Sequence, residues 1–176
     1  MSIGNIIRLQ HYPLPYGELL LGSFEDKLCL CDWNLPSRRR SMDWKLQRGL
    51  YAFFEENPSE VTRKAARMLD EYFAGERTAF DLPLLLVGTD FQRSVWQALQ
   101  SVAYGEVTSY QELAAAIHRP KAVRAVGNAL HVNPVSIFVP CHRVLGANKN
   151  FVGYAGGRAM HGLLLEVEKG RCDFFI

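Results

Sequence analysis

The chain has 176 residues, which suffices for one large domain or two small ones. Hydrophobic residues make up 48% of it, so it can build a core, and no run of about 20 apolar residues is present to span a membrane. Residues 1–20 mix charged, aromatic and proline residues and lack the apolar segment of a signal peptide, which predicts a cytoplasmic protein. Four cysteines are too few for a disulfide scaffold.

The charged residues are distributed unevenly although the formal net charge is only +2. Residues 1–88 carry 11 Lys and Arg against 12 Asp and Glu, whereas residues 89–171 carry 9 against 5. A basic second half favours a polyanionic partner. Ordinary solvated charge explains the same counts, so this observation needs support from the motifs.

The first part of the chain has the pattern of β-strands. Two strand-like segments, residues 17–24 and 27–33, flank a two-residue turn and predict a hairpin. Cys29 and Cys31 lie two positions apart in the second segment, so a regular strand would turn both toward one face as small core residues. Three consecutive arginines at residues 38–40 predict a solvated loop, with a phosphate-binding patch as the alternative.

A helix is expected over residues 61–73, where apolar residues recur at helical spacing after Pro58 and Ser59. Gly75 is its expected stop. Residues 81–89 have the pattern of a strand followed by a linker. The first domain is therefore expected to end at residue 87.

The second part is mostly helical by pattern. Asp90 can cap a helix over residues 91–102, and Ser109 can cap a short helix over residues 110–117. Another helix over residues 121–130 follows directly after a proline. Two short helices joined by a tight turn in a basic segment form a helix-turn-helix signature, although many such pairs bind no nucleic acid.

The helix predicted over residues 121–130 is rich in small side chains around Arg124. Small side chains let a helix approach a nucleic-acid groove closely, but tight packing between helices requires them too. Arg119 before this helix and Lys121 at its start favour the groove. The small residues are Ala122, Ala125, Gly127 and Ala129.

A reactive cysteine is predicted at Cys141, which precedes His142 and follows the apolar run 135–139 and a proline. An adjacent imidazole can generate the nucleophilic thiolate, and a third group should orient that imidazole. Glu166 and Glu168 are the candidates for this third group. The alternative is an inert buried cysteine, which the Pro-Cys-His-Arg context makes much less favoured.

Together these motifs resemble those of a known family, the methylated-DNA–protein-cysteine methyltransferases, which repair O6-alkylguanine. The resemblance covers residues 88–170, and the preceding part matches only weakly in sequence. The segments that carry it are residues 88–92, 104–110, 119–127, 133–134, 140–144 and 153–157.

The resemblance implies a fold of two domains. Residues 1–87 would form an α/β domain, a ribonuclease H-like small sheet plus helix that supports the rest. Residues 88–176 would form a mostly α, winged-helix-like DNA-binding domain that contains the helix-turn-helix and Cys141. The implied partner is double-stranded DNA containing O6-alkylguanine, with O4-alkylthymine left open as a substrate. We expect a monomer.

The resemblance also assigns a role to each catalytic residue. Cys141 would accept the alkyl group irreversibly, so each molecule would act once. His142 would take the thiol proton through a water, and Glu168 would orient it. Asn133 would support the active-site turn, and Tyr110 would polarise the departing guanine. Among the substrate-binding residues, Val144 would read the guanine edge through its backbone, and the pocket wall would be formed by Tyr154 and Ala155.

The same resemblance predicts how DNA is held. The damaged base must leave the stack, because its alkyl carbon is unreachable inside a duplex. Arg124 would fill the space that the base vacates, while the recognition helix enters the minor groove on its small residues Ala125 and Gly127. The predicted phosphate contacts are Gln92, Gln111 and Arg119.

No cofactor or metal is implied for the transfer, and no convincing zinc ligand set is visible in the first domain. The chain departs from the family pattern near its end, with His161 where lysine is common and Gly162 inside the last helix. A mid-helix glycine costs about 1 kcal/mol relative to alanine. The hairpin over residues 147–150 lacks the usual glycine, and asparagine can supply its turn.

Three other functions compete with alkyl transfer. A sensor of alkylated bases would bind without reacting, but non-reacting relatives replace the acceptor cysteine, and Cys141 is present. A transcriptional regulator would use only the helix-turn-helix, and a cysteine hydrolase would leave that motif idle. The intact Cys-His motif beside the helix pair therefore favours the transferase.

Overall fold

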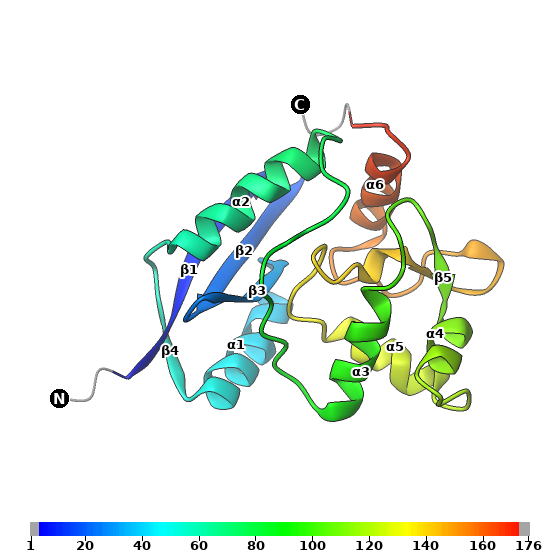
Figure 1. Cartoon of the computed structure of the whole chain (residues 1–176), viewed down its shortest axis with the longest axis horizontal. Coiled ribbons are helices and arrows are strands. Elements are labelled where there is room, and N and C mark those ends of the chain that lie inside the picture. Colours follow the sequence, from blue (N-terminus) through cyan, green and yellow to red (C-terminus); the bar gives the residue numbers. More distant parts are fainter. Residues whose placement is uncertain (1–3, 173–176) are drawn as a thin grey trace.

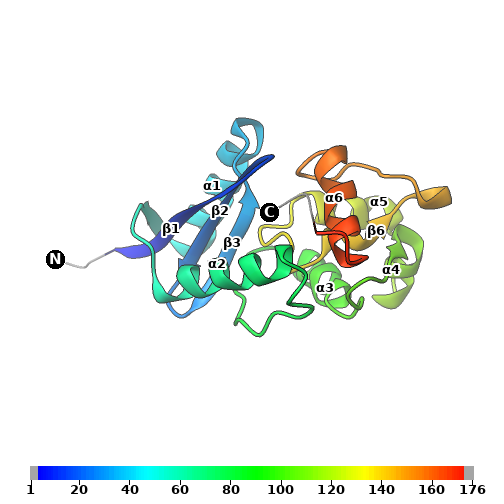
Figure 2. The ribbon, with the colours of Figure 1, turned by 90° about the horizontal axis from the view of Figure 1, so that it is seen from above.

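The computed structural model describes residues 4–172. The ends of the predicted domains, residues 1–3 and 173–176, lie outside the described residues. Two units stand side by side, a sheet with two long helices and a mostly helical unit (Figure 1, Figure 2). Within residues 4–172 no helix is long and apolar enough to cross a membrane.

A four-stranded sheet forms the first unit, in the order β3-β2-β1-β4. The pairs β1–β2 and β2–β3 are antiparallel, whereas β4 pairs with β1 in parallel. The predicted hairpin over residues 17–33 is confirmed. The strands are β1 (Asn5–Leu14), β2 (Gly17–Phe24), β3 (Lys27–Trp33) and β4 (Ala52–Glu55).

A β-bulge changes the orientation expected for the two strand cysteines. The register shifts between Gly22 and Ser23, so the extra residue of β3 lies at Cys29. Cys29 packs in the core on one face of the sheet, and Cys31 packs in the core on the other. The predicted core location is confirmed, since both are fully buried. The prediction that they share a face is wrong.

One helix covers each face of the sheet (Figure 1). The helix α2 (Glu60–Phe73) confirms the prediction over residues 61–73, and Ser59 caps it through a capping box with Thr62. The opposite face packs against α1 (Pro36–Leu50), through Met42 and Leu46.

The prediction of a loop at residues 38–40 is wrong, because these arginines lie in the first turns of α1. Pro36 suits the first helical turn, where its missing N–H is not needed. Arg38 bonds back to the buried Asp32 over 3.1 Å, and Arg39 pairs with Asp43 one turn further on. A run of arginines is typical of a solvated loop. Here the carboxylate partners of Arg38 and Arg39 stabilise it as part of a helix.

Up to residue 172, the helical unit contains four α-helices and a small parallel pair of strands, β5 and β6. The first helix is capped by Thr89 rather than Asp90, and ends at Leu99 rather than residue 102. The helix predicted over residues 110–117 is confirmed, with Ser109 as its cap. The elements are α3 (Asp90–Leu99), β5 (Thr108–Ser109), α4 (Tyr110–Ala116), α5 (Val123–His131), β6 (Val144–Leu145) and α6 (Arg158–Glu168).

Two local differences concern turns. The helix α5 begins at Val123 instead of residue 121, because the preceding residues form a turn in which the Ala122 N–H bonds the Arg119 carbonyl. Within the turn over residues 147–150, which is a 3-10 turn, Asn148 adopts a left-handed backbone with a φ of 57°, as asparagine can in place of glycine, and Lys149 does so too, with a φ of 58°.

The open edge of β3 joins the two units. The predicted strand within residues 81–89 is reduced to one bridge between Leu28 and Leu84. Further along β3, the Cys31 N–H donates to the Pro134 carbonyl over 2.9 Å, and the Ser136 N–H donates to the Cys31 carbonyl over 2.7 Å. One continuous hydrophobic core then spans both units. The segment that leads to Cys141 is thus held by the first unit.

Candidate active site

Cys141 begins a short 3-10 turn, residues Cys141–Arg143, and only 7% of its surface is exposed. Asn133 braces the chain before it, because its Nδ2 donates to the Val139 carbonyl and its Oδ1 accepts from the Val135 N–H. These bonds measure 3.0 and 2.9 Å. The cysteine therefore sits on a rigid buried turn.

The Cys141 thiol is protonated at rest. Burial raises its pKa, and the nearby polar side chains of Asn133 and Ser136 only partly oppose this effect. A base is required to form the thiolate that a displacement reaction needs.

A buried histidine–carboxylate pair lies beside this turn. His142 Nε2 donates to Glu168 Oε1 over 2.6 Å, and their side chains are 0% and 1% exposed. Burial lowers the pKa of His142, although Glu168 opposes it, so the imidazole is neutral. Its Nδ1 is buried without a hydrogen-bond partner in the described part of the chain. A neutral imidazole with one free lone pair can accept a proton.

Glu168 stays ionised because donors surround it. Arg143 Nε bonds Oε2 over 2.9 Å, and the Gly105 N–H bonds the same oxygen over 3.1 Å. Burial raises the pKa of Glu168, but hydrogen bonds from His142 and Arg143 and the positive charge of Arg143 bring it down to about 2. The other candidate, Glu166, pairs with Lys169 and Arg171 at the surface. The structure therefore places Glu168, and not Glu166, against His142.

A cavity of about 20 Å³ opens onto Cys141. It gathers residues from α4, α5 and the loop before α6, which are far apart in the sequence. This volume has room for about one water molecule and not for a larger ligand. The lining residues are Tyr110, Gly127, Leu130, Cys141, Val152, Gly153, Tyr154, Ala155 and His161.

Three hydrogen bonds hold this cavity closed. Tyr110 Oη donates to the Val152 carbonyl over 3.0 Å, and Trp33 Nε1 donates to Tyr154 Oη over 3.2 Å. His161 Nε2 donates to the His142 carbonyl over 2.6 Å, with its ring against that of Tyr154.

The predicted DNA-binding residues divide between two places. Arg124, Ala125, Gln111 and Arg119 are exposed on and between α4 and α5. Arg124 lies one turn before Gly127 on the same helix face, and Gly127 lines the Cys141 cavity. The side chain of the predicted finger therefore starts near the mouth of that cavity.

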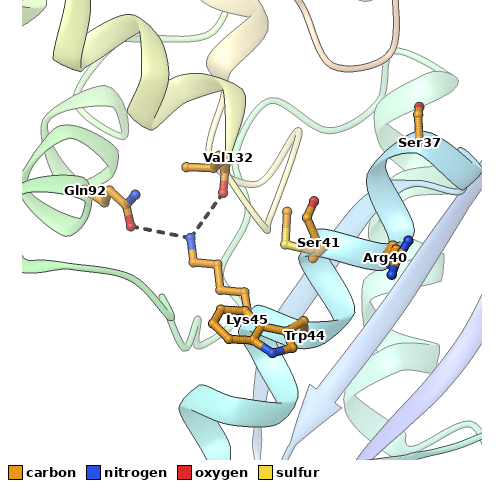
Figure 3. Close-up of a pocket in the computed structure, with 8 residues that line it drawn as sticks. Ser37, Arg40, Ser41, Trp44, Lys45, Gln92 and Val132 are labelled. Carbon is orange, nitrogen blue, oxygen red and sulfur yellow. Dashed lines mark hydrogen bonds between the residues drawn. The ribbon is translucent and has the colours of Figure 1, made fainter.

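Gln92 lies apart from this surface. It lines a separate cavity of about 700 Å³ beside α1, where its Oε1 accepts from Lys45 Nζ over 3.4 Å (Figure 3). The same oxygen accepts from the Thr89 N–H and so caps α3. Val144, the predicted reader of the guanine edge, is 1% exposed in β6 and is not among the residues that line the Cys141 cavity.

The motifs gave no indication of two contacts that the first unit makes with the site. Trp33 ends β3, and Tyr72 in α2 donates its hydroxyl to Glu168 Oε1 over 2.9 Å. Both fitted the apolar pattern of their elements, so nothing marked their polar atoms. No three His, Cys, Asp or Glu side chains among residues 4–172 are arranged to hold a metal ion.

The fold and the site define a two-domain protein, a small sheet domain and a helical domain, that carries a buried cysteine beside a histidine–carboxylate pair. Comparison with known families gives two matches. The 6-O-methylguanine DNA methyltransferase ribonuclease-like domain matches residues 7–86, and the DNA binding domain of the same family matches residues 90–170. The chain belongs to the 6-O-methylguanine DNA methyltransferase family.

Individual relatives agree over nearly the whole chain. The constitutive methylated-DNA–protein-cysteine methyltransferase of Bacillus subtilis is 44% identical over 156 residues, 88% of this chain and 91% of its own. A crystal structure of the Mycobacterium tuberculosis O6-methylguanine methyltransferase superposes with a TM-score of 0.79 at 38% identity, covering 94% of both chains. A structure of the M. tuberculosis protein in complex with DNA gives 0.76 at 39% identity and the same coverage.

Proposed function

We propose that this protein repairs alkylated DNA by direct reversal, moving the alkyl group of O6-alkylguanine to Cys141. The observation that carries this assignment is the shared cavity, in which the Cys141 thiol meets Tyr110 of α4 and Gly127 of α5. A pair of helices suited to DNA and a thiol suited to displacement thus meet at one place. The family match and the DNA complex of the M. tuberculosis relative support the same conclusion.

The chemistry is a single displacement. His142 Nδ1 takes the Cys141 proton through a water, and the thiolate attacks the alkyl carbon. The new S–C bond forms as the C–O6 bond breaks, and the electron pair passes to guanine. Burial raises the pKa of Tyr110, so its hydroxyl is protonated and can donate to the departing base. The hydrogen bond from Tyr110 stabilises the departing guanine anion, the proton held on His142 balances its charge, and each protein molecule acts once.

The damaged base reaches Cys141 by leaving the duplex. In this proposal α5 lies in the minor groove on Ala125 and Gly127, and Arg124 fills the vacated space. Gln111 and Arg119 contact phosphates, while Gln92 has only its amide N–H groups free for this purpose because its oxygen is engaged. Val144 contributes through its backbone, and the wall of the opened pocket is formed by Tyr154 and Ala155.

The finer description of the fold belongs to the same proposal. A winged-helix-like arrangement for residues 88–176 is supported by the α4–α5 pair beside β5 and β6. A ribonuclease H-like sheet for residues 1–87 is supported by the family model that matches there. A cytoplasmic location agrees with a substrate in DNA.

The assignment is tested by weighing the protein after incubation with duplex DNA that carries O6-methylguanine. We expect a gain of one methyl group in the wild type and in Cys172→Ala, whose cysteine is partly exposed. We expect no gain in Cys141→Ala. Tight binding to the lesion without a mass gain in the wild type would instead establish a sensor of alkylated bases.

A further inference from the structure

A tyrosine from the sheet domain lies inside the catalytic hydrogen-bond network. Tyr72 is in the last turn of α2, whose C-terminal end lies beside α6 (Figure 1). Its side chain is fully buried, and its hydroxyl lies 2.9 Å from Glu168 Oε1 and 3.4 Å from His142 Nε2. One hydroxyl from another domain therefore contacts both members of the pair.

Core packing explains the ring of Tyr72 but not its hydroxyl. The ring contacts those of Phe73, Phe80 and Tyr104, with centroids 5.3, 5.6 and 6.2 Å away. A phenylalanine would make the same contacts. A buried hydroxyl is unfavourable unless it is hydrogen-bonded, and this one donates to Glu168. Burial and the charge of Glu168 raise the pKa of Tyr72, so the hydroxyl remains a donor.

The geometry of the carboxylate shows what this donor does. Glu168 Oε2 is held by Arg143 and by the Gly105 N–H. Oε1 accepts from His142 and Tyr72, and from Arg143 Nη2 over 3.0 Å. The hydroxyl fixes Oε1, the oxygen that orients His142. Of these donors, Tyr72 is the one that comes from the sheet domain.

We propose that Tyr72 is a positioning residue of the alkyl transfer, through which the sheet domain fixes the Glu168 carboxylate and so aims His142 at the Cys141 proton. This inference rests on the proposed function and extends it. It gives the sheet domain a part in the chemistry, beyond supporting the helical domain.

The test compares Tyr72→Phe with Tyr12→Phe. Tyr12 is a matched control. Its hydroxyl donates over 2.7 Å to Asp70, which lies in α2 as Tyr72 does, and it makes no hydrogen bond to Glu168. Transfer from O6-methylguanine DNA is followed in single-turnover experiments. We expect the rate constant at saturating DNA to fall about tenfold in Tyr72→Phe and to change less than about twofold in Tyr12→Phe. The DNA concentration that gives half of the maximal rate constant should be unchanged in both variants. Equal rates in Tyr72→Phe and wild type would overturn the proposal.

The pH profile separates positioning from loss of packing. Without the hydroxyl, Glu168 keeps more negative charge for His142 and favours its protonated form. Because transfer needs neutral His142, the acidic limb of the rate profile should move to higher pH in Tyr72→Phe only. A lower rate with an unmoved limb would contradict the proposal. The ionisable groups that face His142 are Glu168, Tyr72, Arg143 and His161.

Two further measurements make the result independent of other causes. In a Glu168→Gln background, the Tyr72→Phe change should cost less than about twofold, since the two residues act together. An undiminished effect there would show that Tyr72 does not act through Glu168.

The His142 titration can be followed by NMR without any DNA. A shift in Tyr72→Phe supports the positioning role even if the wild type transfers no methyl group, an outcome that would reject the proposed function alone.

Discussion

At the scale of single residues, the spacing of Glu166 and Glu168 explains why the sequence left two candidates. Successive residues of a helix turn by about 100°, so positions two apart face nearly opposite directions. One of the two glutamates had to point outward, but the pattern did not say which. In the structure Glu168 is the one that points inward, where it pairs with Arg143 and His142. Adjacent motif residues could be predicted, whereas the donors that surround the carboxylate could not.

The buried carboxylate predicts an acid-dependent stability. The pKa of Glu168 is about 2 in the folded protein against an ordinary value of 4.5. A lowered pKa stabilises the fold above pH 4.5, and this contribution is lost as the pH falls toward 2. It amounts to about 3 kcal/mol at most.

Urea unfolding across this pH range checks the expectation. In the wild type the free energy of unfolding should decrease more steeply on acidification than in Glu168→Gln, which has no carboxyl group to titrate there. Burial lowers the pKa of His142 as well, and this adds a loss of stability in acid at higher pH. Parallel curves for the two proteins between pH 4.5 and 2 would show that Glu168 is not linked to folding in this way.

At the scale of elements, the two helices that begin at a serine cap were predictable, whereas α1, which is held by a distant partner, was not. Ser59 and Ser109 marked the starts of α2 and α4 correctly. Each serine side chain accepts a hydrogen bond from the N–H three residues later, so the whole cap lies within a short stretch of sequence. The helix α1 was missed because Asp32, the partner of Arg38, lies outside it. The bulge at Cys29 was missed because register depends on the neighbouring strand.

The departure at Gly162 is predicted to cost stability without harming the site. Gly162 lies inside α6, and a Cβ added there would meet nothing within 4 Å. Gly162→Ala should therefore raise the free energy of unfolding by about 1 kcal/mol and leave the transfer rate unchanged. Gly157, the N-cap of the same helix, is the matched control. It also has open space, but its φ is 88°, so Gly157→Ala should destabilise. Chemical denaturation of both variants measures the difference, and a destabilised Gly162→Ala would refute the argument.

At the scale of the whole molecule, residues of both domains form the candidate active site. The β3 edge holds the chain before Cys141, Tyr72 contacts Glu168, and Trp33 bonds Tyr154 in the cavity wall. These contacts join residues about a hundred positions apart. No periodicity or local motif pairs such positions, so the sequence predicted a sheet part, a helical part and a candidate turn at Cys141, but not the contacts between the two parts.

The Trp33 contact predicts that the sheet domain also shapes substrate binding. Trp33 is 3% exposed, and its indole N–H holds the Tyr154 hydroxyl over 3.2 Å. It packs so closely on Gly156 that a Cβ there would approach Trp33 Nε1 to 2.5 Å. Trp33→Phe removes the donor and loosens the wall of the pocket. The His142–Glu168 pair is untouched, so binding should weaken while the saturated rate is kept.

Reaction with free O6-benzylguanine tests this, because the free base needs the pocket but not the DNA surface. Loss of one hydrogen bond predicts a half-saturation constant about fivefold higher for Trp33→Phe, from about 1 kcal/mol. Trp44→Phe, which alters a tryptophan 62% exposed on α1, should behave as the wild type. A lower saturated rate with unchanged half-saturation would place Trp33 in the chemical step instead. Unchanged kinetics in Trp33→Phe would show that the wall is positioned by the helical domain alone.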